Sequence, residues 1–153
     1  MILITNGKVI TRDGDNPYLA DGAVLVDGRY IQAVGPRSKL ENAYPDAQRV
    51  DARGGVIMPA FINVHSHIYS ALARGLSIKG FNPTNFYEIL DGQWWAIDRN
   101  LTLEVTRASA YTTILECIRN GVTSIIDHHA SYGEIEGSLF AIKDVAKDRK
   151  SVG

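Results

Sequence analysis

The pattern of apolar residues changes near residue 58, and this change limits the folds that the chain can adopt. Before it, apolar and polar residues alternate in short β-branched runs between Gly, Asp and Pro, which predicts four or five strands. After it, short strand-like runs at 61–64 and 122–126 alternate with helical patterns, and this alternation predicts parallel pairing. We therefore expect an α/β protein divided into residues 1–57 and residues 58–153.

Local sequence signals predict individual elements within residues 1–57. The run 23–34 reads as two strands joined by Asp27-Gly28, whose residues tolerate the positive φ of a type I′ turn, so it predicts a hairpin. A short helix is expected over 38–44, after Pro36. A return to strand is expected over 49–57.

The second part contains two predicted helices around the 122–126 strand. Thr102 is the candidate N-cap of a helix over 103–119, in which Cys117 is expected to be a buried structural thiol. The last helix is expected to bury a face made of Leu139, Ile142, Val145 and Ala146. Between 69 and 100 lies a long insertion, whose later half predicts a helix rich in aromatic residues.

Composition excludes several classes of partner. The chain has 16 Lys and Arg against 17 Asp and Glu, a formal net charge of −1, and no basic stripe, which argues against nucleic acid or an anionic membrane. Its apolar runs are far shorter than the ~20 residues of a membrane span. Cys117 is the single cysteine and the N-terminus lacks a signal-peptide pattern, so a reducing cytoplasm is expected.

The motif most informative about chemistry is His65-Ser66-His67, directly after the first strand of the second part. Residues two apart in a strand point the same way, so both imidazoles are expected on one side, where they can share a metal ion. A His-x-His motif alone is a weak signal, because surface and core histidines also produce it. Its place at the carboxyl end of a parallel strand strengthens the prediction.

The run VIMPAFINVHSH at 56–67, after a strand-rich segment, resembles the signature of the amidohydrolase superfamily. Residues 68–75, Trp94-Trp95 and 127–131 resemble the aminohydrolases linked to selenium metabolism, relatives of guanine deaminase and the chlorohydrolases. The resemblance implies part of a small β-sandwich at 1–57, followed by the first two βα units of a (β/α)8 TIM barrel. It also implies hydrolysis of a C–N bond in a small molecule, such as deamination of a heterocycle, and a homo-oligomer in the full-length family.

The resemblance also implies roles for individual residues. His65 and His67 become ligands of a divalent metal, zinc in the first place, with iron or manganese as alternatives. The expected substrate-side residues are Tyr69, Arg74, Trp94, His128 and His129, although a solvated Arg74, lid or core packing of Trp94 and surface or capping roles for the last two histidines remain open.

The remaining catalytic residues of the family come from later strands, and this chain has no residues that match them. Catalytic zinc takes about three protein ligands, so we expect a truncated fragment that is inactive and poorly soluble by itself. Two alternatives remain. One is a non-catalytic structural or binding fragment. The other is a manganese phosphoesterase that uses Asp127-His128-His129 together with Asp13-Gly14-Asp15.

Overall fold

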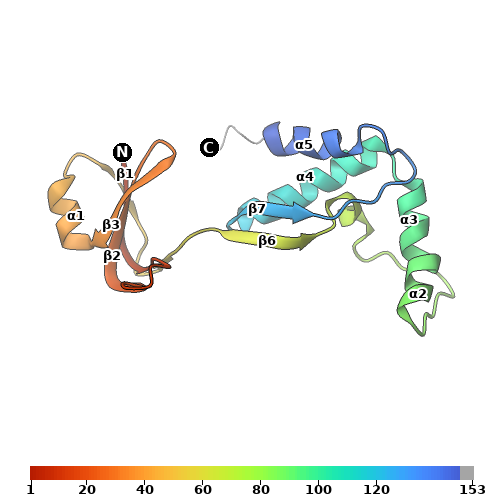
Figure 1. Ribbon diagram of the computed structural model, residues 1–153, viewed down its shortest axis with the longest axis horizontal. Helices are drawn as coiled ribbons and strands as arrows, with labels where there is room; N and C mark the ends of the chain where they lie inside the picture. The colour runs from red at the N-terminus through yellow and green to blue at the C-terminus, as the bar shows by residue number, and fades with distance from the viewer. Residues whose placement is uncertain (149–153) are drawn as a thin grey trace. The chain divides into compact units, whose positions relative to one another are not determined.

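The computed structural model describes residues 1–148, which form two compact units that divide between Pro59 and Ala60 (Figure 1). Each unit has its own sheet and its own apolar core.

The first unit is a five-stranded sheet with one helix. Its order is β3-β2-β1-β4, and β5 also pairs with β1. The β1–β2 and β2–β3 pairs are antiparallel, whereas β4 and β5 run parallel to β1. Its core is formed by Leu3, Ala23, Leu25, Leu40 and Ala47. The elements are β1 Ile2–Ile10, β2 Tyr18–Asp27, β3 Tyr30–Pro36, α1 Arg37–Ala43, β4 Gln48–Asp51 and β5 Val56–Ile57.

The predicted hairpin is present as β2 and β3, but its turn differs from the expectation. Asp27 pairs with Tyr30, so the loop residues are Gly28 and Arg29 rather than Asp27 and Gly28. Only Gly28 has a positive φ, +56°. A positive φ at the first loop residue alone is the pattern of a type II′ turn, which favours glycine at that position. The strand expected over 49–57 is also divided in two, because a turn separates β4 from β5.

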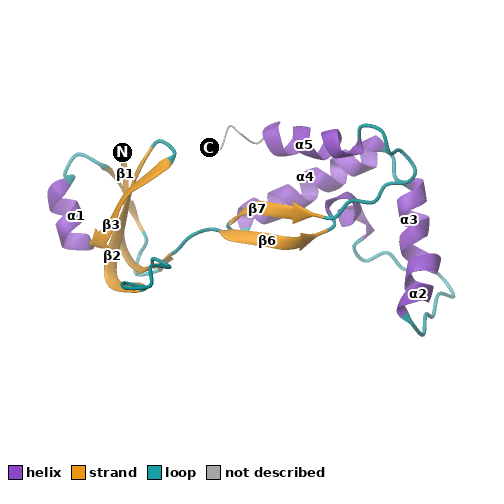
Figure 2. Cartoon of the chain, in the orientation of Figure 1, coloured by secondary structure: helices purple, strands orange, loops and turns teal. Residues whose placement is uncertain are grey.

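The second unit pairs two parallel strands, β6 and β7, with helices (Figure 2). Its core joins residues of η1, α4 and α5: Ile68, Ala110, Ile114, Ile142 and Val145. The insertion between β6 and α4 is helical over most of its second half, as predicted, and includes a π-helical turn. The elements are β6 Phe61–Ser66, the 3-10 helix η1 Ile68–Ala73, α2 Phe86–Ile89, the π-helical η2 Leu90–Trp94, α3 Trp95–Asn100, α4 Leu103–Arg119, β7 Val122–Asp127 and α5 Ser138–Asp148.

The β6–β7 register contains an irregularity directly before the His-x-His motif. Asn63 pairs with Ile125 and Ser66 with Asp127, so β6 has one more residue than β7 over this stretch. The Asn63 side chain accepts a hydrogen bond from the His65 N–H at 3.2 Å, which supports the extra residue locally. A bulge of this kind changes the direction of the side chains that follow it, and such bulges occur frequently next to functional sites.

The predicted features of helices α4 and α5 can be compared with the structure. Helix α4 begins after Thr102, whose side chain accepts a hydrogen bond from the Val105 N–H at 3.2 Å, so the predicted N-cap is confirmed. Cys117 is buried, as expected, and burial raises the pKa of its thiol. The face predicted for α5 is wrong in part, because Leu139 and Ala146 are exposed. Helix α5 instead buries Ser138 and Ala141 beside Ile142 and Val145.

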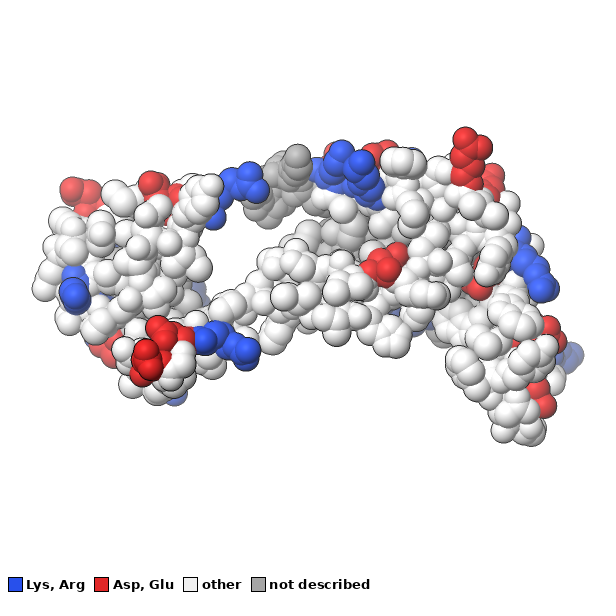
Figure 3. Space-filling view, in the orientation of Figure 1, with Lys and Arg blue, Asp and Glu red and all other residues white. Residues whose placement is uncertain are grey.

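Charged side chains are scattered over both units. In the face drawn in Figure 3, acidic and basic residues lie between larger uncharged areas. Within residues 1–148, no helix combines the length and the apolar character needed to cross a membrane.

Candidate functional site

The two histidines of the His-x-His motif converge at the end of β6. The Nε2 atoms of His65 and His67 are 3.2 Å apart, and the ring centroids are 5.2 Å apart. Both side chains are exposed, whereas Ser66 between them is buried on the opposite side. The expected convergence of the two rings is therefore present in the structure.

The geometry of this pair fits a shared metal ion. Two nitrogen ligands at ~2.1 Å from one tetrahedral zinc lie about 3.4 Å apart, close to the separation seen here. Neutral imidazole is also among the commonest metal ligands in proteins. The described residues contain no group of three or more His, Cys, Asp or Glu side chains able to hold a metal. His65 and His67 thus form a pair of candidate ligands, without a third ligand among residues 1–148.

A second group of polar and aromatic side chains adjoins the pair. The Tyr69 ring lies 6.1 Å from the His67 ring and 5.3 Å from the His129 ring, centroid to centroid. His129 Nε2 lies 3.1 Å from the Ser131 hydroxyl, which donates to the Glu134 carbonyl. We call Tyr69, Asp98, His129 and Ser131 the buried polar cluster. Burial and the nearby Asp98 charge raise the pKa of Tyr69 to about 12, so its hydroxyl stays protonated at neutral pH.

Two atoms of the buried polar cluster lack hydrogen-bond partners among the described residues. They are Asp98 Oδ1 and His129 Nδ1. Asp98 is only 5% exposed, and burial raises the pKa of its carboxyl group. Burial likewise lowers the pKa of His129, because it disfavours the charged ring. A buried polar atom without a partner costs about 1–3 kcal/mol, and such atoms are frequently functional.

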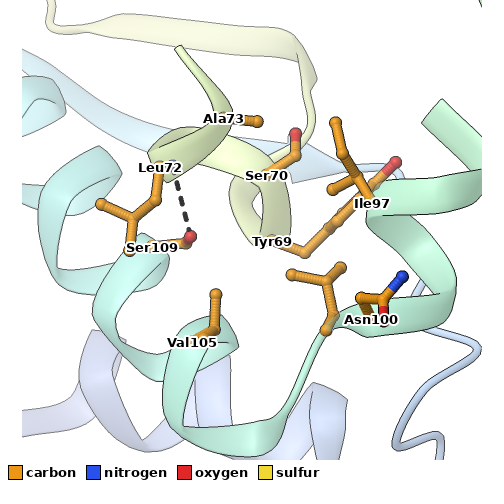
Figure 4. A pocket seen from close by; sticks show the side chains of 9 residues that line it. Tyr69, Ser70, Leu72, Ala73, Ile97, Asn100, Val105 and Ser109 are labelled. Atoms are coloured by element: carbon orange, nitrogen blue, oxygen red, sulfur yellow. Dashed lines mark hydrogen bonds between the residues drawn. The ribbon is translucent and has the colours of Figure 1, made fainter. Parts of the chain in front are cut away.

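A cavity of about 210 Å³ lies between η1 and the helices α3 and α4 (Figure 4). Tyr69 lines this cavity as well as belonging to the buried polar cluster. The Leu72 N–H donates to the Ser109 hydroxyl across the cavity wall at 3.4 Å. Most of the remaining lining is apolar, from Leu72, Ala73, Ile97, Leu101 and Val105.

Some of the other predicted substrate-side residues lie close to His67, and others do not. The His128 ring is exposed and lies 5.3 Å from the His67 ring, whereas the His129 ring turns inward to Tyr69. Arg74 directly follows η1 with an exposed side chain, and among the described residues no hydrogen bond or ring contact joins it to the histidines. Trp94 is half-buried at the end of η2. The aromatic contact nearby joins Trp95, the first residue of α3, to Tyr87 of α2, with ring centroids 5.5 Å apart.

Sequence reasoning missed two members of the buried polar cluster, Asp98 and Ser131. Asp98 follows two tryptophans and precedes Arg99, so it looks like half of a solvated charge pair. The available signal was its place in an insertion too apolar to be a solvated loop. Ser131 follows Asp127-His128-His129 in a loop, and no periodic pattern there distinguishes a buried serine from an exposed one.

The chain has relatives among characterised enzymes. It is 26% identical over 138 residues to a 5-methylthioadenosine/S-adenosylhomocysteine deaminase of Pelotomaculum thermopropionicum, covering 90% of this chain and 31% of that protein. It is 32% identical over 126 residues to a 5'-deoxyadenosine deaminase of Methanosarcina mazei, covering 82% of this chain and 27% of that protein. The chain therefore spans about a third or less of the length of these relatives.

The fold is also found in solved structures. A variant of atrazine chlorohydrolase TrzN from Arthrobacter aurescens TC1, in complex with zinc and atraton, matches with a TM-score of 0.78 and 28% identity. The match covers 97% of this chain and 33% of that chain.

Two family descriptions match separate segments. Residues 22–47 match the imidazolonepropionase-like composite domain of bacteria. Residues 56–152 match the amidohydrolase family, and this segment is well over half of the chain and contains both His65-Ser66-His67 and Asp127-His128-His129. The resemblance expected from the run at 56–67 is confirmed, and the chain belongs to the amidohydrolase family.

Proposed function

We propose that this chain supplies the first metal-bearing part of a hydrolase that cleaves a C–N bond in a small heterocyclic substrate, of the aminohydrolase or deaminase type. The observation that carries the proposal is the 3.2 Å separation of His65 Nε2 and His67 Nε2 at the end of a parallel strand. The deaminase relatives and the zinc-containing structural match support the same chemistry.

In this proposal His65 and His67 hold a divalent metal, zinc in the first place. When bound, such a metal acts as a Lewis acid and lowers the pKa of water toward neutrality, which makes hydroxide available as a nucleophile. The chain's own contribution is to hold the two imidazoles together on one exposed side of β6.

The substrate side is proposed to begin at Tyr69 and His129. Tyr69 is the residue common to both regions, because its ring lies 6.1 Å from the His67 ring and it also lines the cavity. Asp98 Oδ1 can accept a hydrogen bond from a substrate N–H or O–H. Because the Ser131 hydroxyl donates to the Glu134 carbonyl, it accepts from His129 Nε2, and Nδ1 of the neutral His129 ring is left as an acceptor. His128, Trp94 and Arg74 remain candidates at the edge of this region.

The proposed architecture is the start of a (β/α)8 barrel at 58–153, preceded by part of a β-sandwich at 1–57. The parallel β6–β7 pair covered by α4 and α5 is what such a start requires. Ile62, Val64 and Ile126 of these strands are each more than half exposed, as expected for strands that pack against further parts of a barrel. A cytoplasmic location and a homo-oligomeric assembly belong to the same proposal.

We also propose that this chain has no turnover by itself, because the described residues hold two of the approximately three ligands that catalytic zinc takes. A non-catalytic binding role of the isolated chain remains the alternative. The phosphoesterase hypothesis loses its support, because the amidohydrolase match accounts for Asp127-His128-His129 and for His65-Ser66-His67 together.

The test is a calorimetric titration of the metal-free chain with zinc chloride. Wild type is expected to bind one zinc ion per chain, and His65→Ala and His67→Ala are each expected to abolish binding. His128→Ala is the matched control, because it removes an exposed neighbouring imidazole that the proposal does not use as a ligand. Equal binding by wild type and both His-x-His variants would contradict the metal site. Ammonia release from a panel of purines, nucleosides and triazines is expected from a full-length relative and not from this chain.

A further inference from the structure

The ends of β6 and β7 are tied by three hydrogen bonds that surround His67. The His128 N–H donates to the Ser66 carbonyl at 2.9 Å, and the Ile68 N–H donates to Asp127 Oδ1 at 2.8 Å. The third bond joins His67 Nδ1 to the His128 carbonyl at 3.2 Å. The residue before His67, the residue after it and its own ring are thus all bonded to residues 127 and 128.

The bond to the His128 carbonyl determines the protonation of the His67 ring. A carbonyl oxygen only accepts hydrogen bonds, so Nδ1 must carry the proton. In the neutral ring Nε2 then carries the lone pair, and this atom faces His65 Nε2. Two lone pairs at 3.2 Å repel each other unless a proton or a cation lies between them. The His128 carbonyl, directly after β7, therefore leaves His67 Nε2 as an acceptor for the position that it shares with His65.

Asp127 contributes its side-chain carboxylate to these hydrogen bonds, whereas Ser66 and His128 contribute backbone atoms. Its Oδ1 holds the first amide of η1, directly after His67. His67 has an irregular backbone conformation, φ −127° and ψ 73°, between the end of β6 and the start of η1. Without an acceptor for the Ile68 amide, this connection loses the contact that fixes the His67 backbone relative to β7.

We infer that Asp127 is a positioning residue that, with the His128 carbonyl, holds His67 in the Nδ1–H tautomer with Nε2 directed at the metal position. The inference rests on the proposed function, because it assigns that position to a metal. It gives Asp127 a role in metal affinity without direct contact to the metal. Partners of this kind, which orient a ligating histidine, contribute about tenfold to a hundredfold to metal affinity.

The wild-type chain provides the first test, in the metal-free state and with uniform ¹⁵N and ¹³C labelling. Long-range ¹H–¹⁵N correlations are expected to show His67 with Nδ1 protonated and Nε2 unprotonated. A coupling through the hydrogen bond is expected between the Ile68 nitrogen and the Asp127 carboxyl carbon. A His67 ring protonated at Nε2, or an undetectable coupling, would overturn the inference without any substitution.

Two variants provide the second test, with zinc chloride as the probe. Asp127→Leu removes the acceptor while keeping a similar side-chain shape, and is expected to weaken zinc binding about tenfold to a hundredfold and to mix the His67 tautomers. Asp127→Asn keeps an acceptor oxygen and is expected to restore both properties. Equal zinc affinity in wild type and Asp127→Leu would overturn the positioning role alone. If zinc changes the NMR signals of neither the His65 ring nor the His67 ring, the proposed metal site is contradicted. The positioning of His67 is then still decided by its tautomer and by the Ile68–Asp127 coupling in the metal-free chain.

Discussion

Replacing Asp98 by Asn is expected to stabilise the metal-free chain at neutral pH. Asp98 is 5% exposed, and its Oδ1 has no hydrogen-bond partner among the described residues. A buried unsatisfied group costs about 1–3 kcal/mol and more when it is charged. Asn has nearly the same size but no charge, so the free energy of unfolding should rise by roughly 1 kcal/mol, the low end of that range, since the amide also remains incompletely bonded.

The pH dependence identifies the charge as the cause. Burial raises the pKa of Asp98 above its ordinary value of 3.8, so the folded chain binds its proton more tightly than the unfolded chain does. The contribution of Asp98 to stability is therefore fully present below pH 3.8 and is lost as pH rises through the folded pKa. The advantage of Asp98→Asn should be absent at pH 3 and should grow to a plateau above the folded pKa.

Urea unfolding followed by circular dichroism between about pH 3 and pH 8 measures this difference. The matched control is Asp91→Asn, an exposed aspartate in the same helical segment, which should change stability by less than about 0.5 kcal/mol. A stability gain in Asp98→Asn that does not vary with pH would refute the reasoning, because the charge would not be its cause. A loss of stability at neutral pH would also refute it, because it would show that the carboxylate is already satisfied. Because the same oxygen is proposed to accept from substrate, the corresponding change in a full-length relative should weaken substrate binding.

Three other substitutions test neighbouring parts of the structure. Gly133→Ala should destabilise the second unit by about 1–3 kcal/mol in urea unfolding, because a Cβ there would lie 2.7 Å from the Arg99 carbonyl oxygen and closer still to the Leu101 carbonyl oxygen. Thr102→Ala should cost about 1 kcal/mol, because the Val105 amide loses its cap, and Thr102→Ser should recover most of it. In a full-length relative, replacing the residue equivalent to His129 by Ala should lower turnover more than zinc content, measured by atomic absorption; loss of zinc would instead make it a ligand.

The features predictable from the sequence are those that follow from local periodicity. The two-residue spacing of His65 and His67 predicts their common direction, and the helical pattern at 103–119 after Thr102 predicts the bounds of α4. The sequence does not specify the extra residue in β6, because it becomes visible only when Asn63 and Ser66 are matched with their partners in β7.

Burial of polar side chains is harder to predict from the sequence. Helix α5 buries Ser138 where the apolar pattern favoured Leu139, and the Ser138 hydroxyl is satisfied by the Ile135 carbonyl at 2.8 Å. Asp98 Oδ1 is buried without such a partner, and neither helix propensity nor the amphipathic pattern indicates this burial. Positions of this kind depend on contacts between segments far apart in the chain, such as the approach of Tyr69 and His129.

The π-helical turn η2 sets the angular position of everything that follows it in the insertion. In a regular α-helix each residue turns through about 100°, so Tyr87 and Trp95, eight residues apart, would point about 80° away from each other. One extra residue in a π turn brings eight residues close to two full turns, and the rings of Tyr87 and Trp95 meet at 5.5 Å. Converting η2 into a regular α-helix with the same number of residues would thus rotate Asp98 by about 100° relative to α2, whereas removing one residue between 90 and 94 would leave its angular position nearly unchanged. The position of Trp95 against Tyr87 and the position of the buried Asp98 carboxylate therefore both depend on the π turn, and a regular α-helix of the same length would change both.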